Sequence, residues 1–537
     1  MLMNKYLLPM MLLLSAVLFF LLYDGNPDNS INVTHPEYDD STVDYVQVTT
    51  YHSSENKSGY TYEELVAGDG YDNGKDIELE VLFQELDDGN VCQNCYGYSM
   101  VTANAVFSQR GQSSRIMDKK SFKVALNPDG EPYKGEYILN LKKHTSDITK
   151  VKNKLIFDLI GDIPNTLVPN TKFVHLTVRD LTGTGEYIDL GLFTHHEQVD
   201  EYFLQRRGLN TNGNMYNINF FEFYRYEDSI MLESDPMYKK SDFEDYLESK
   251  LDDDHTKLID LLDAIESPLV PINAVVSNYF NRDNYLTYLA VNMIVDNIDA
   301  AGRNFRLYSP ADEDAWYFIF WDLDKTFNNE NVLANQWRTG IHLYMNDNLH
   351  GQFLEIEENR DDLTEKMEEL RPYFTDEIIN AYLEEYRLIA EDLIIQEIST
   401  DTFPVTYDYV VSELSQITDW VDRNYDDYYE SLKTPKPVFI GNFERKTNYH
   451  TLAWNESFDF NDEALSYTVK ISTNPEMTDI VHEETTTDTE IAIENFEPGN
   501  YFVTVTTENE SGYTQEAYDQ YIDGLNYYFG VKNLVAE

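Results

Sequence analysis

The stretch "VNMIVDNIDAAGRNFRLYSPADEDAWYFIFWDLDKTF" (residues 291–327) places acidic and amide side chains between two apolar runs. Its spacing predicts a buried helix that ends near Asn297, followed by a loop and a short strand. A second strand, over "AWYFIFW", leads into the polar turn "DLDKTF". Asp299, Asn304 and Asp322 therefore stand at the ends of packed elements. Rigid supports of this kind suit a site whose charged groups must not move.

The intervals between these residues indicate phosphoryl transfer. Four residues separate Asp299 from Asn304, the interval between the catalytic acid and the metal-binding amide in the H-R-D-x-x-x-x-N loop of protein kinases. Asp322 follows at a strand end, where kinases place a metal-binding carboxylate. Magnesium takes oxygen ligands and neutralises charge on phosphates. The D-x-x-x-x-N interval by itself is a weak signal for a kinase. Together with the W-D-x-D that follows the aromatic strand, it is a much more selective one.

Four segments resemble, in order, the motifs of the CotH kinase family, the atypical kinases related to spore coat protein H. They are "SQRGQSSRIMDKKSFKVAL" (108–126), "VKNKLIFDLIGDI" (151–163), "GLFTHHEQVDEYFLQRRGLNTNGNMYN" (191–217) and "NIDAAGRNFRLYS" with "WYFIFWDLDKTF" (297–309 and 316–327). The resemblance covers roughly residues 75–430. It is specific because the motifs occur together and in the same order.

The resemblance implies an α+β, two-lobed protein-kinase-like fold over residues 76–432. A strand-rich lobe (about 76–197) and a helical lobe (about 198–432) would enclose ATP with Mg²⁺ or Mn²⁺. It also implies that Asp299 is the catalytic-loop acid, Asn304 a metal ligand and Asp322 the principal metal-binding carboxylate. Asp324, two residues further along an extended segment, is a second metal-ligand candidate. The alternative for Asp324 is a turn or a structural salt bridge.

The nucleotide side is predicted from the first of these motifs. A glycine permits close approach of the backbone to phosphate, and the candidates for such a turn are Arg110, Gly111, Ser113 and Ser114. Alternation places Lys123 on the strand face opposite Phe122 and Val124, and Lys120 is the rival for a phosphate-contacting lysine. Asp158, in the helix that follows, either orients that lysine or is an ordinary exposed carboxylate.

The amino-acid composition limits the classes of molecule that the protein is expected to bind. The chain has 537 residues with 39 basic and 97 acidic side chains, a net charge of -58. Such a surface repels phosphate backbones and anionic lipid, so we expect no nucleic-acid partner. It favours a basic protein substrate that carries Ser or Thr. With 41 Tyr, 28 Phe and 5 Trp the chain is also no disordered acidic tail.

The amino terminus predicts export. Lys5 precedes an apolar run from Tyr6 to Tyr23, so residues 1–23 form either a cleaved signal peptide or an uncleaved membrane anchor. We expect contact with the membrane through this segment only, and a location at the cell surface or outside the cell. Residues 24–75 are rich in Asp, Asn, Ser, Thr and Tyr, which is typical of a flexible stalk.

Two short motifs invite other chemistry. Cys92 and Cys95 are the only cysteines, and outside the cell we expect them to form a small structural disulfide. Two thiols cannot complete a four-ligand zinc site. The sequence "HHE" at residues 195–197 suggests a metal, but adjacent residues of a strand point to opposite sides, so we do not expect a zinc site there.

The carboxyl-terminal part changes pattern after the proline-containing linker "SLKTPKPVF" (431–439). Residues 436–525 form alternating strands and resemble an all-β fibronectin type III-like sandwich. Trp454 stands where such a core needs a large aromatic side chain, and Tyr501 at the strand start of a tyrosine corner. The predicted role of this domain is that of a spacer or adhesive module.

These observations together predict an exported atypical protein kinase. It would transfer the ATP γ-phosphoryl group to Ser or Thr of cell-surface or spore-coat-type proteins. One alternative is a non-catalytic surface scaffold or adhesion protein with a kinase-like fold. Another is a carbohydrate-active enzyme that uses the Asp322 and Asp324 carboxylates.

Overall fold

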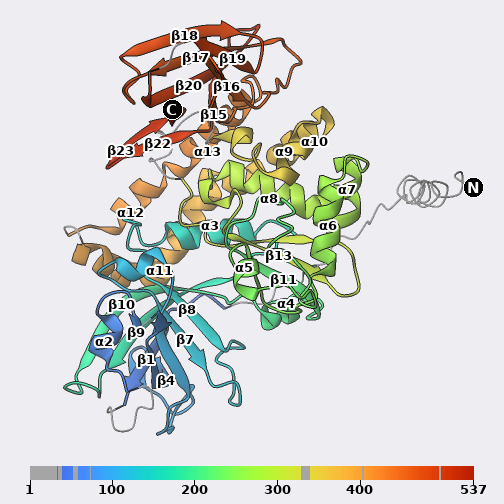
Figure 1. The fold of residues 1–537 in the computed structure, drawn as a ribbon. Helices are drawn as coiled ribbons and strands as arrows, with labels where there is room; N and C mark the ends of the chain where they lie inside the picture. Colours follow the sequence, from blue (N-terminus) through green and yellow to red (C-terminus); the bar gives the residue numbers. More distant parts are fainter. Residues whose placement is uncertain are drawn as a thin grey trace, which may run out of the picture.

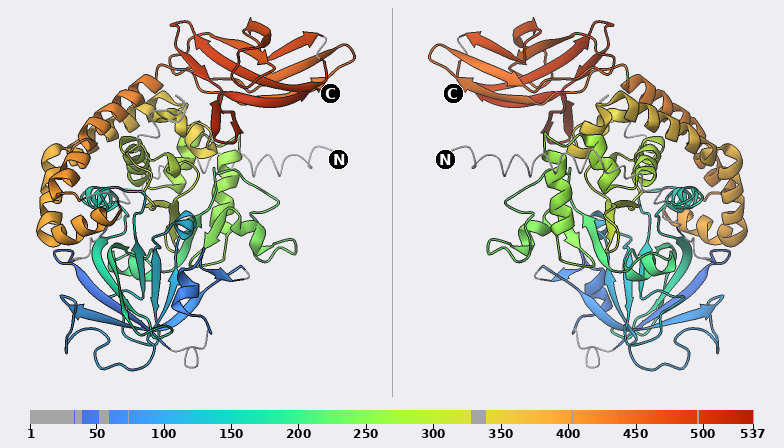
Figure 2. Two further views of the ribbon diagram at one scale, coloured as in Figure 1. Left: turned by 90° about the vertical axis from the view of Figure 1, so that its left-hand side faces the viewer. Right: turned by 90° about the vertical axis from the view of Figure 1, so that its right-hand side faces the viewer.

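Figure 1 shows the computed structural model, in which strands and helices are both abundant. The structure describes residue 33 and residues 39–51, 59–72, 74–327, 339–401, 404–494 and 497–536. Helices account for 30% of the chain and strands for 29%, which confirms the predicted α+β class. The views in Figure 2 place a β-rich part at one end, helices in the middle and a second β-rich part at the other end.

The first β-rich part is a closed sheet. Its order is β1-β9-β10-β8-β7-β6-β4-β5, and β1 also pairs with β4, so seven of the strands form a ring. The strands are β1 (Asp44–Thr50), β4 (Glu78–Asp87), β5 (Asn90–Val91), β6 (Ala105–Gln109), β7 (Phe122–Leu126), β8 (Ile138–Lys142), β9 (Thr171–Arg179) and β10 (Tyr187–His196). Phe122, Val124 and Leu126 are buried inside the ring, as the alternation predicts.

Part of the range predicted as a flexible stalk is folded, so the prediction was wrong for these residues. Strand β1 lies between β4 and β9 and completes the ring. Helix α2 (Tyr62–Val66) begins with a capping box, in which Thr61 and Glu64 satisfy each other's backbone N–H groups. The small hairpin of β2 (Tyr71–Asp72) and β3 (Lys75–Asp76) follows. The backbone hydrogen bonds of β1 to two neighbours outweigh the polar composition around it.

The middle part combines helices with a four-stranded antiparallel sheet of order β12-β11-β13-β14. Its strands are β11 (Gly213–Ile218), β12 (Leu247–Ser249), β13 (Phe305–Pro310) and β14 (Tyr317–Phe320). Its helices are α3 (Lys152–Gly161), α4 (Glu201–Arg206), α5 (Lys240–Glu244), α6 (Thr256–Glu266), α7 (Ile272–Tyr279), α8 (Arg282–Ile294), α9 (Asn348–Leu354), α10 (Glu357–Leu370), α11 (Asp376–Asp401), α12 (Tyr407–Leu414) and α13 (Ile417–Ser431). Strand β12 separates α5 from α6, and its pairing with β11 overrides the helical spacing of apolar residues in this stretch.

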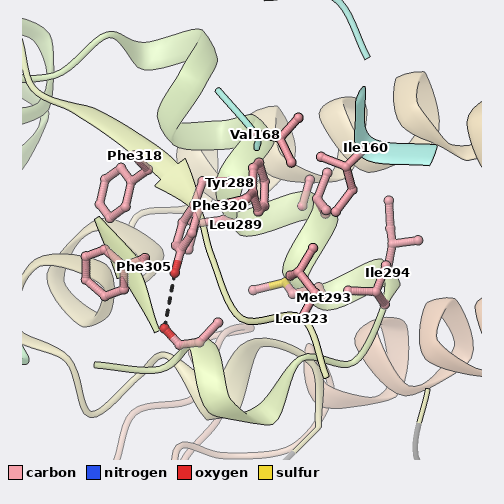
Figure 3. Packing of buried hydrophobic residues seen from close by; sticks show 14 of the residues in the cluster. Ile160, Val168, Tyr288, Leu289, Met293, Ile294, Phe305, Phe318, Phe320 and Leu323 are labelled. Carbon is pink, nitrogen blue, oxygen red and sulfur yellow. Dashed lines mark hydrogen bonds between the residues drawn. The ribbon is translucent and has the colours of Figure 1, made fainter. Parts of the chain in front are cut away.

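The core of the middle part forms where α8 packs against β13 and β14 (Figure 3). Every residue of α8 from Asn284 to Ile294 is buried, as expected for a helix that is apolar on all sides. Tyr288 stacks on Phe318 with ring centroids 4.4 Å apart, and Phe305 and Phe320 pack beside them. This core gives rigid support to the loops at both of its ends.

The carboxyl-terminal part contains two facing sheets and a separate hairpin of β22 and β23. One has the order β15-β16-β19 and the other β18-β17-β20-β21, with β24 also paired to β20. The strands are β15 (Ile440–Arg445), β16 (Tyr449–Trp454), β17 (Leu465–Ser472), β18 (Ile480–Thr486), β19 (Glu490–Glu494), β20 (Gly499–Asn509), β21 (Thr514–Glu516), β22 (Gln520–Asp523), β23 (Asn526–Phe529) and β24 (Val531–Ala536). Trp454 is buried in the core, and Tyr501 Oη donates to the carbonyl O of Glu497 at 2.9 Å. The strands continue past residue 525, where we had expected the domain to end.

Two further expectations concern the cysteines and the amino terminus. Cys92 and Cys95 are joined in a disulfide with Cα atoms 5.4 Å apart. The apolar run at residues 6–23 lies outside the described residues. Among the helices that the structure describes, none is both long enough and apolar enough to cross a membrane.

Candidate active site

Asp322 and Asn304 lie at the same end of the β13–β14 pair. Phe305 pairs with Phe320 in the antiparallel register, so Asn304 precedes the first pair and Asp322 follows the last. Both have left-handed backbones, with φ of 58° for Asn304 and 53° for Asp322. Non-glycine residues adopt this conformation at a cost, and such residues cluster at functional sites.

Asp299 lies in a short 3-10 turn, η2 (Ile298–Ala300), directly after α8. Buried hydrogen bonds hold this loop: Asn297 Nδ2 donates to Asn292 Oδ1 at 2.9 Å. Tyr288 Oη donates to the carbonyl O of Ala300 at 3.2 Å, the bond drawn in Figure 3. Arg303 Nη2 donates to Asp299 Oδ1 at 2.6 Å. The core side chains thus fix the position of the predicted catalytic acid.

A cavity of about 250 Å³ separates the closed sheet from the turn after β14. Asp322 and Asp324 line it from the side of the middle part. Three of the residues predicted for the phosphate-facing turn also line it: Arg110, Gly111 and Ser114. The remaining lining residues are Gln112, Met117, Ser121, Lys142, His144, Thr145, Ser146, Asp147, Lys152, Asn153 and Lys325. The structure therefore brings together residues that are about two hundred positions apart in the sequence.

The central contact of this cavity is an ion pair between Lys142 Nζ and Asp322 Oδ1 at 2.5 Å. Burial by itself would raise the pKa of Asp322, but Lys142 and Arg110 hold that pKa below its usual value. The same burial lowers the pKa of Arg110, against the attraction of Asp322 and Asp324. Asp322 is therefore ionised and neutralised by two cations from the opposite wall.

Asp324 has the opposite electrostatic environment. Burial and the neighbouring charge of Asp322 raise its pKa, and the charge of Asp299 adds to the shift. Three carboxylates thus influence one another at this end of the middle part. Close negative charges favour a bound cation, which would relieve their repulsion.

The cavity is richer in positive charge than the protein as a whole. Its lining contains four basic side chains (Arg110, Lys142, Lys152 and Lys325) and three acidic ones (Asp147, Asp322 and Asp324), whereas the chain has 39 basic and 97 acidic residues. A local excess of cations in so acidic a protein indicates an anionic ligand.

Gly111 is required by the turn that it forms. Its φ is 88°, and a Cβ at this position would lie 2.1 Å from Ser114 Oγ. Ser114 Oγ in turn donates to the carbonyl O of Arg110 at 3.0 Å. The turn therefore closes tightly on itself at the edge of the cavity, and its contact with phosphate stays a prediction. The side chain of Ser113 lies outside the described part of the chain.

The two lysines predicted to contact phosphate are not in this cavity. Lys120 Nζ donates to the carbonyl O atoms of Gly68, which follows α2, and of Arg115, which lies in η1 (Ser113–Ile116), at 2.7 and 2.6 Å. Lys123 lies on β7 beside Asn140 of β8, and it does not belong to the described lining. Asp299 and Asn304 are not part of that lining either, although the charge of Asp299 reaches Asp324 and raises the pKa of that residue.

Lys142 is the functional candidate that sequence reasoning missed. It ends β8 in "YILNLKKH", where Leu139 and Leu141 face the core of the ring. Alternation assigns Lys142 to the opposite face, and this was the available signal. It was weak, because Lys143 follows directly and the acidic partners are far away in sequence.

Three other sequence candidates have structural partners. Asp158 is half-buried rather than exposed, and Lys154 Nζ donates to Asp158 Oδ2 at 2.8 Å. Glu197 is fully buried and pairs with Arg206 and Arg207 at 2.5 and 2.8 Å. His195 Nε2 lies 3.4 Å from Glu136 Oε2, whereas the ring of His196 packs against Phe157. The side chains of His195 and His196 therefore contact different parts of the molecule.

The residues at this site fit a divalent cation with phosphate. Among the described residues, no three His, Cys, Asp or Glu side chains form a complete metal cage. Carboxylates of Asp322 and Asp324 and the amide of Asn304 are the hard oxygen donors that Mg²⁺ prefers. Magnesium in kinases takes its remaining ligands from phosphates and water, so an incomplete set of protein donors matches that chemistry.

Comparison with known proteins agrees with this geometry. No curated protein matches the chain. The family described as CotH kinase protein matches residues 107–427, which is more than half of the chain. The match includes Arg110, Lys142, Asp299, Asn304 and Asp322. The chain therefore belongs to the CotH kinase family.

Proposed function

We propose that this protein is an ATP-dependent protein kinase that phosphorylates Ser or Thr side chains of exported proteins. The supporting observation is the cation-rich cavity in which Lys142 and Arg110 face the Asp322 carboxylate. A triphosphate is a compact polyanion that such a cavity would attract. Membership of the CotH kinase family supports the phosphotransferase class.

Each residue has a proposed role that follows from its position. Bound ATP with Mg²⁺ or Mn²⁺ would supply the phosphoryl group and the neutralising cation. Asp322, Asp324 and Asn304 would hold the cation through their oxygen atoms. Arg110 and Lys142 would bind phosphate oxygens from the opposite wall, and the backbone at Gly111 would approach them closely.

Asp299 is proposed to orient the substrate hydroxyl and accept its proton. Arg303 donates to Oδ1 of Asp299 at 2.6 Å. We therefore propose that the other carboxylate oxygen, Oδ2, accepts the proton of the substrate hydroxyl. The buried hydrogen bonds of Asn297 and Tyr288 keep the loop in place. A positioned base of this kind needs a rigid support to be efficient.

The substrate and location follow from charge and from the amino terminus. A protein with a net charge of -58 favours basic substrates. The apolar run at residues 6–23 supports export, with the protein anchored at the cell surface or secreted. We propose that the closed sheet and the middle part act as the two lobes of a kinase-like fold. The carboxyl-terminal sandwich would be a fibronectin type III-like spacer or adhesive domain.

The test is the substitution Asp322→Asn in the full-length chain. This change keeps the size of the side chain and a hydrogen-bond acceptor for Lys142, but removes the charge that binds a cation. We expect magnesium-dependent autophosphorylation with labelled ATP to fall at least about a thousandfold. Asp314→Asn, an exposed position on the same β13–β14 connection, serves as the matched control. Equal labelling of the Asp322 and Asp314 variants would remove Asp322 from catalysis.

A non-catalytic scaffold is the second candidate. It is favoured by the direct contact of Lys142 with Asp322, because this pair satisfies both charges in the absence of any ligand. Thermal denaturation separates the two functions. A competent site should gain about 2.7 kcal/mol of stability from Mg²⁺–ATP at a hundred times its Kd. No gain at saturating Mg²⁺–ATP would favour the scaffold.

A further inference from the structure

A second cavity, of about 560 Å³, lies between the middle part and the carboxyl-terminal sandwich. We call it the interdomain cavity. Of the described residues, none lines both this cavity and the candidate active site. Its lining residues are Tyr224, Met345, Asn346, Asp347, Asn348, Gly351, Gln352, Glu355 and Lys436 from the middle part and linker, with Phe439, Ile440, Gly441, Ala453, Trp454, Asn455 and Tyr518 from the sandwich. Its volume falls within the usual range for small-molecule sites.

The two walls of the interdomain cavity are held together firmly. Phe460 of the sandwich is buried in the core of the middle part. Arg360 lies over the Phe460 ring at 4.9 Å and donates to its carbonyl O at 3.1 Å. Tyr518 Oη donates to the carbonyl O of His342 at 3.0 Å. The cavity is therefore pre-formed, which lowers the cost of ordering a ligand in it.

Aromatic rings line the sandwich side of the cavity. Phe439 stacks on Tyr518 with centroids 4.8 Å apart and planes at 27°. Although it is stacked on one side, Phe439 remains 41% exposed. Tyr224, on the opposite wall, has the same exposure. Large aromatic faces left open to water around a cavity indicate a ligand with an apolar surface of its own.

Two buried polar atoms at the cavity have no hydrogen-bond partner within the described chain: Trp454 Nε1 and Asp347 Oδ2. The first is a donor, and the Asp347 side chain is only 4% exposed. The other oxygen, Oδ1, already accepts from the backbone N–H groups of Leu349 and His350 at 2.9 Å. Unsatisfied buried groups are costly, so a ligand whose groups accept from Trp454 Nε1 and can either accept from or donate to Asp347 Oδ2 would stabilise this site.

The interdomain cavity has little net charge. Its basic residue, Lys436, pairs with Glu355 at 3.2 Å. Burial raises the pKa of Asp347 to about 8, so this carboxyl group is largely protonated near neutral pH. An ionic ligand would therefore find no uncompensated partner in the lining.

We propose that the interdomain cavity binds a neutral oligosaccharide. A sugar hydroxyl donates and accepts at the same time, which matches the unpartnered atoms of Asp347 and Trp454. The C–H face of a pyranose ring is apolar and packs against an aromatic ring such as that of Phe439. The low net charge of the lining, the exposed aromatic faces and the unpartnered polar atoms all fit this class of ligand.

Calorimetric titration of the full-length protein tests this site. The probes are neutral trisaccharides of glucose, galactose, mannose, xylose and N-acetylglucosamine, each titrated separately. We expect saturable binding of at least one probe. Phe439→Ala should weaken that binding about tenfold through loss of the stacking surface. Tyr449→Ala, a sandwich position of equal exposure that does not belong to the described lining, should leave it unchanged.

A second variant separates hydrogen bonding from folding. Trp454→Phe retains an aromatic ring in the sandwich core, but it removes the Nε1 donor that has no partner within the described chain. We expect weaker sugar binding with an unchanged circular dichroism spectrum. Absence of saturable binding for all five trisaccharides would overturn the proposal, as would equal affinity of wild type and Phe439→Ala. Saturable binding of neutral peptides in place of the sugars would overturn it too.

Discussion

The two cavities on either side of the middle part differ in charge and in what closes them. The candidate active site has four basic and three acidic side chains in about 250 Å³. The interdomain cavity has one basic and two acidic side chains in about 560 Å³. The first fits a polyanion with its cation, and the second a neutral molecule. One chain of charge -58 therefore offers two very different local electrostatic environments, because burial and placement decide local charge.

The contacts that join the neighbouring parts of the molecule at the two cavities also differ in charge. Ion pairs connect the closed sheet to the middle part, and the one between Lys143 and Glu397 is buried. Lys142 pairs with Asp322, and Lys143 Nζ contacts Glu397 Oε2 of α11 at 2.8 Å. The sandwich is instead held mainly by the Phe460 ring, which packs in the core of the middle part, and by hydrogen bonds from Arg360 and Tyr518 to backbone carbonyl groups. Buried ion pairs carry a desolvation penalty and lose much when one partner is removed, whereas aromatic packing is insensitive to salt.

The largest expected effect is on stability, from Glu397→Gln. Lys143 and Glu397 are 5% and 6% exposed, and Lys119 contacts the same carboxylate at 2.7 Å. Loss of the charge should lower the free energy of unfolding by about 3–5 kcal/mol.

Urea denaturation measures this free energy, and Glu391→Gln serves as the control. Glu391 lies on the same helix in an exposed pair with Arg387 at 3.4 Å, which should contribute at most about 1 kcal/mol. Similar losses of unfolding free energy for both variants would show that the buried pair contributes no more than the exposed one.

The next effect concerns phosphoryl transfer. Lys142→Met removes the cation that faces Asp322, so we expect the rate of autophosphorylation to fall about a hundredfold, or ~2.7 kcal/mol. Lys123→Met, on the neighbouring strand β7, should change the rate by less than about threefold. Sugar binding should be the same in both variants. A larger loss in the Lys123 variant would restore the sequence-based assignment of the phosphate-contacting lysine.

Salt should distinguish the two cavities further. Raising ionic strength from about 0.1 to 1 M shortens the screening length from about 10 to 3 Å. The thermal stabilisation by Mg²⁺–ATP at fixed concentration should therefore decrease. The affinity for a neutral trisaccharide should stay within about twofold over the same range. Parallel thermal shift and calorimetric series would show whether charge really separates the two sites.

The smallest effect is a pH dependence at the interdomain cavity. Burial raises the pKa of Asp347 from 3.8 to about 8, so the folded protein keeps a proton that the unfolded chain has lost. This contribution to stability is complete below pH 4 and is lost as pH rises toward 8. Asp347→Asn cannot titrate, so its unfolding free energy should improve relative to wild type between pH 4 and 8. A difference that is independent of pH in urea denaturation would show that Asp347 is ionised throughout.

Several elements and half of the site followed from the sequence. Apolar spacing located α8, β13 and β14, because one side of each had to face a core. Of the three residues chosen from their intervals, Asp322 lines the candidate active site, and the catalytic and metal-binding roles of Asp299, Asn304 and Asp322 stay predictions. The stalk prediction was wrong over β1 because its pairing partners, β4 and β9, come later in the chain. Composition carries no information about such partners.

The sequence alone pointed to the acidic residues as a candidate site, since the intervals between them are short and local. Only the tertiary structure decided which lysine meets them. Lys142 and Lys143 are adjacent and project to opposite sides of the end of β8, where each contacts a carboxylate. Their partners, Asp322 and Glu397, are 180 and 254 residues away. The interdomain cavity is likewise a product of docking, because its aromatic wall and its carboxyl group belong to parts that the chain brings together only when it folds.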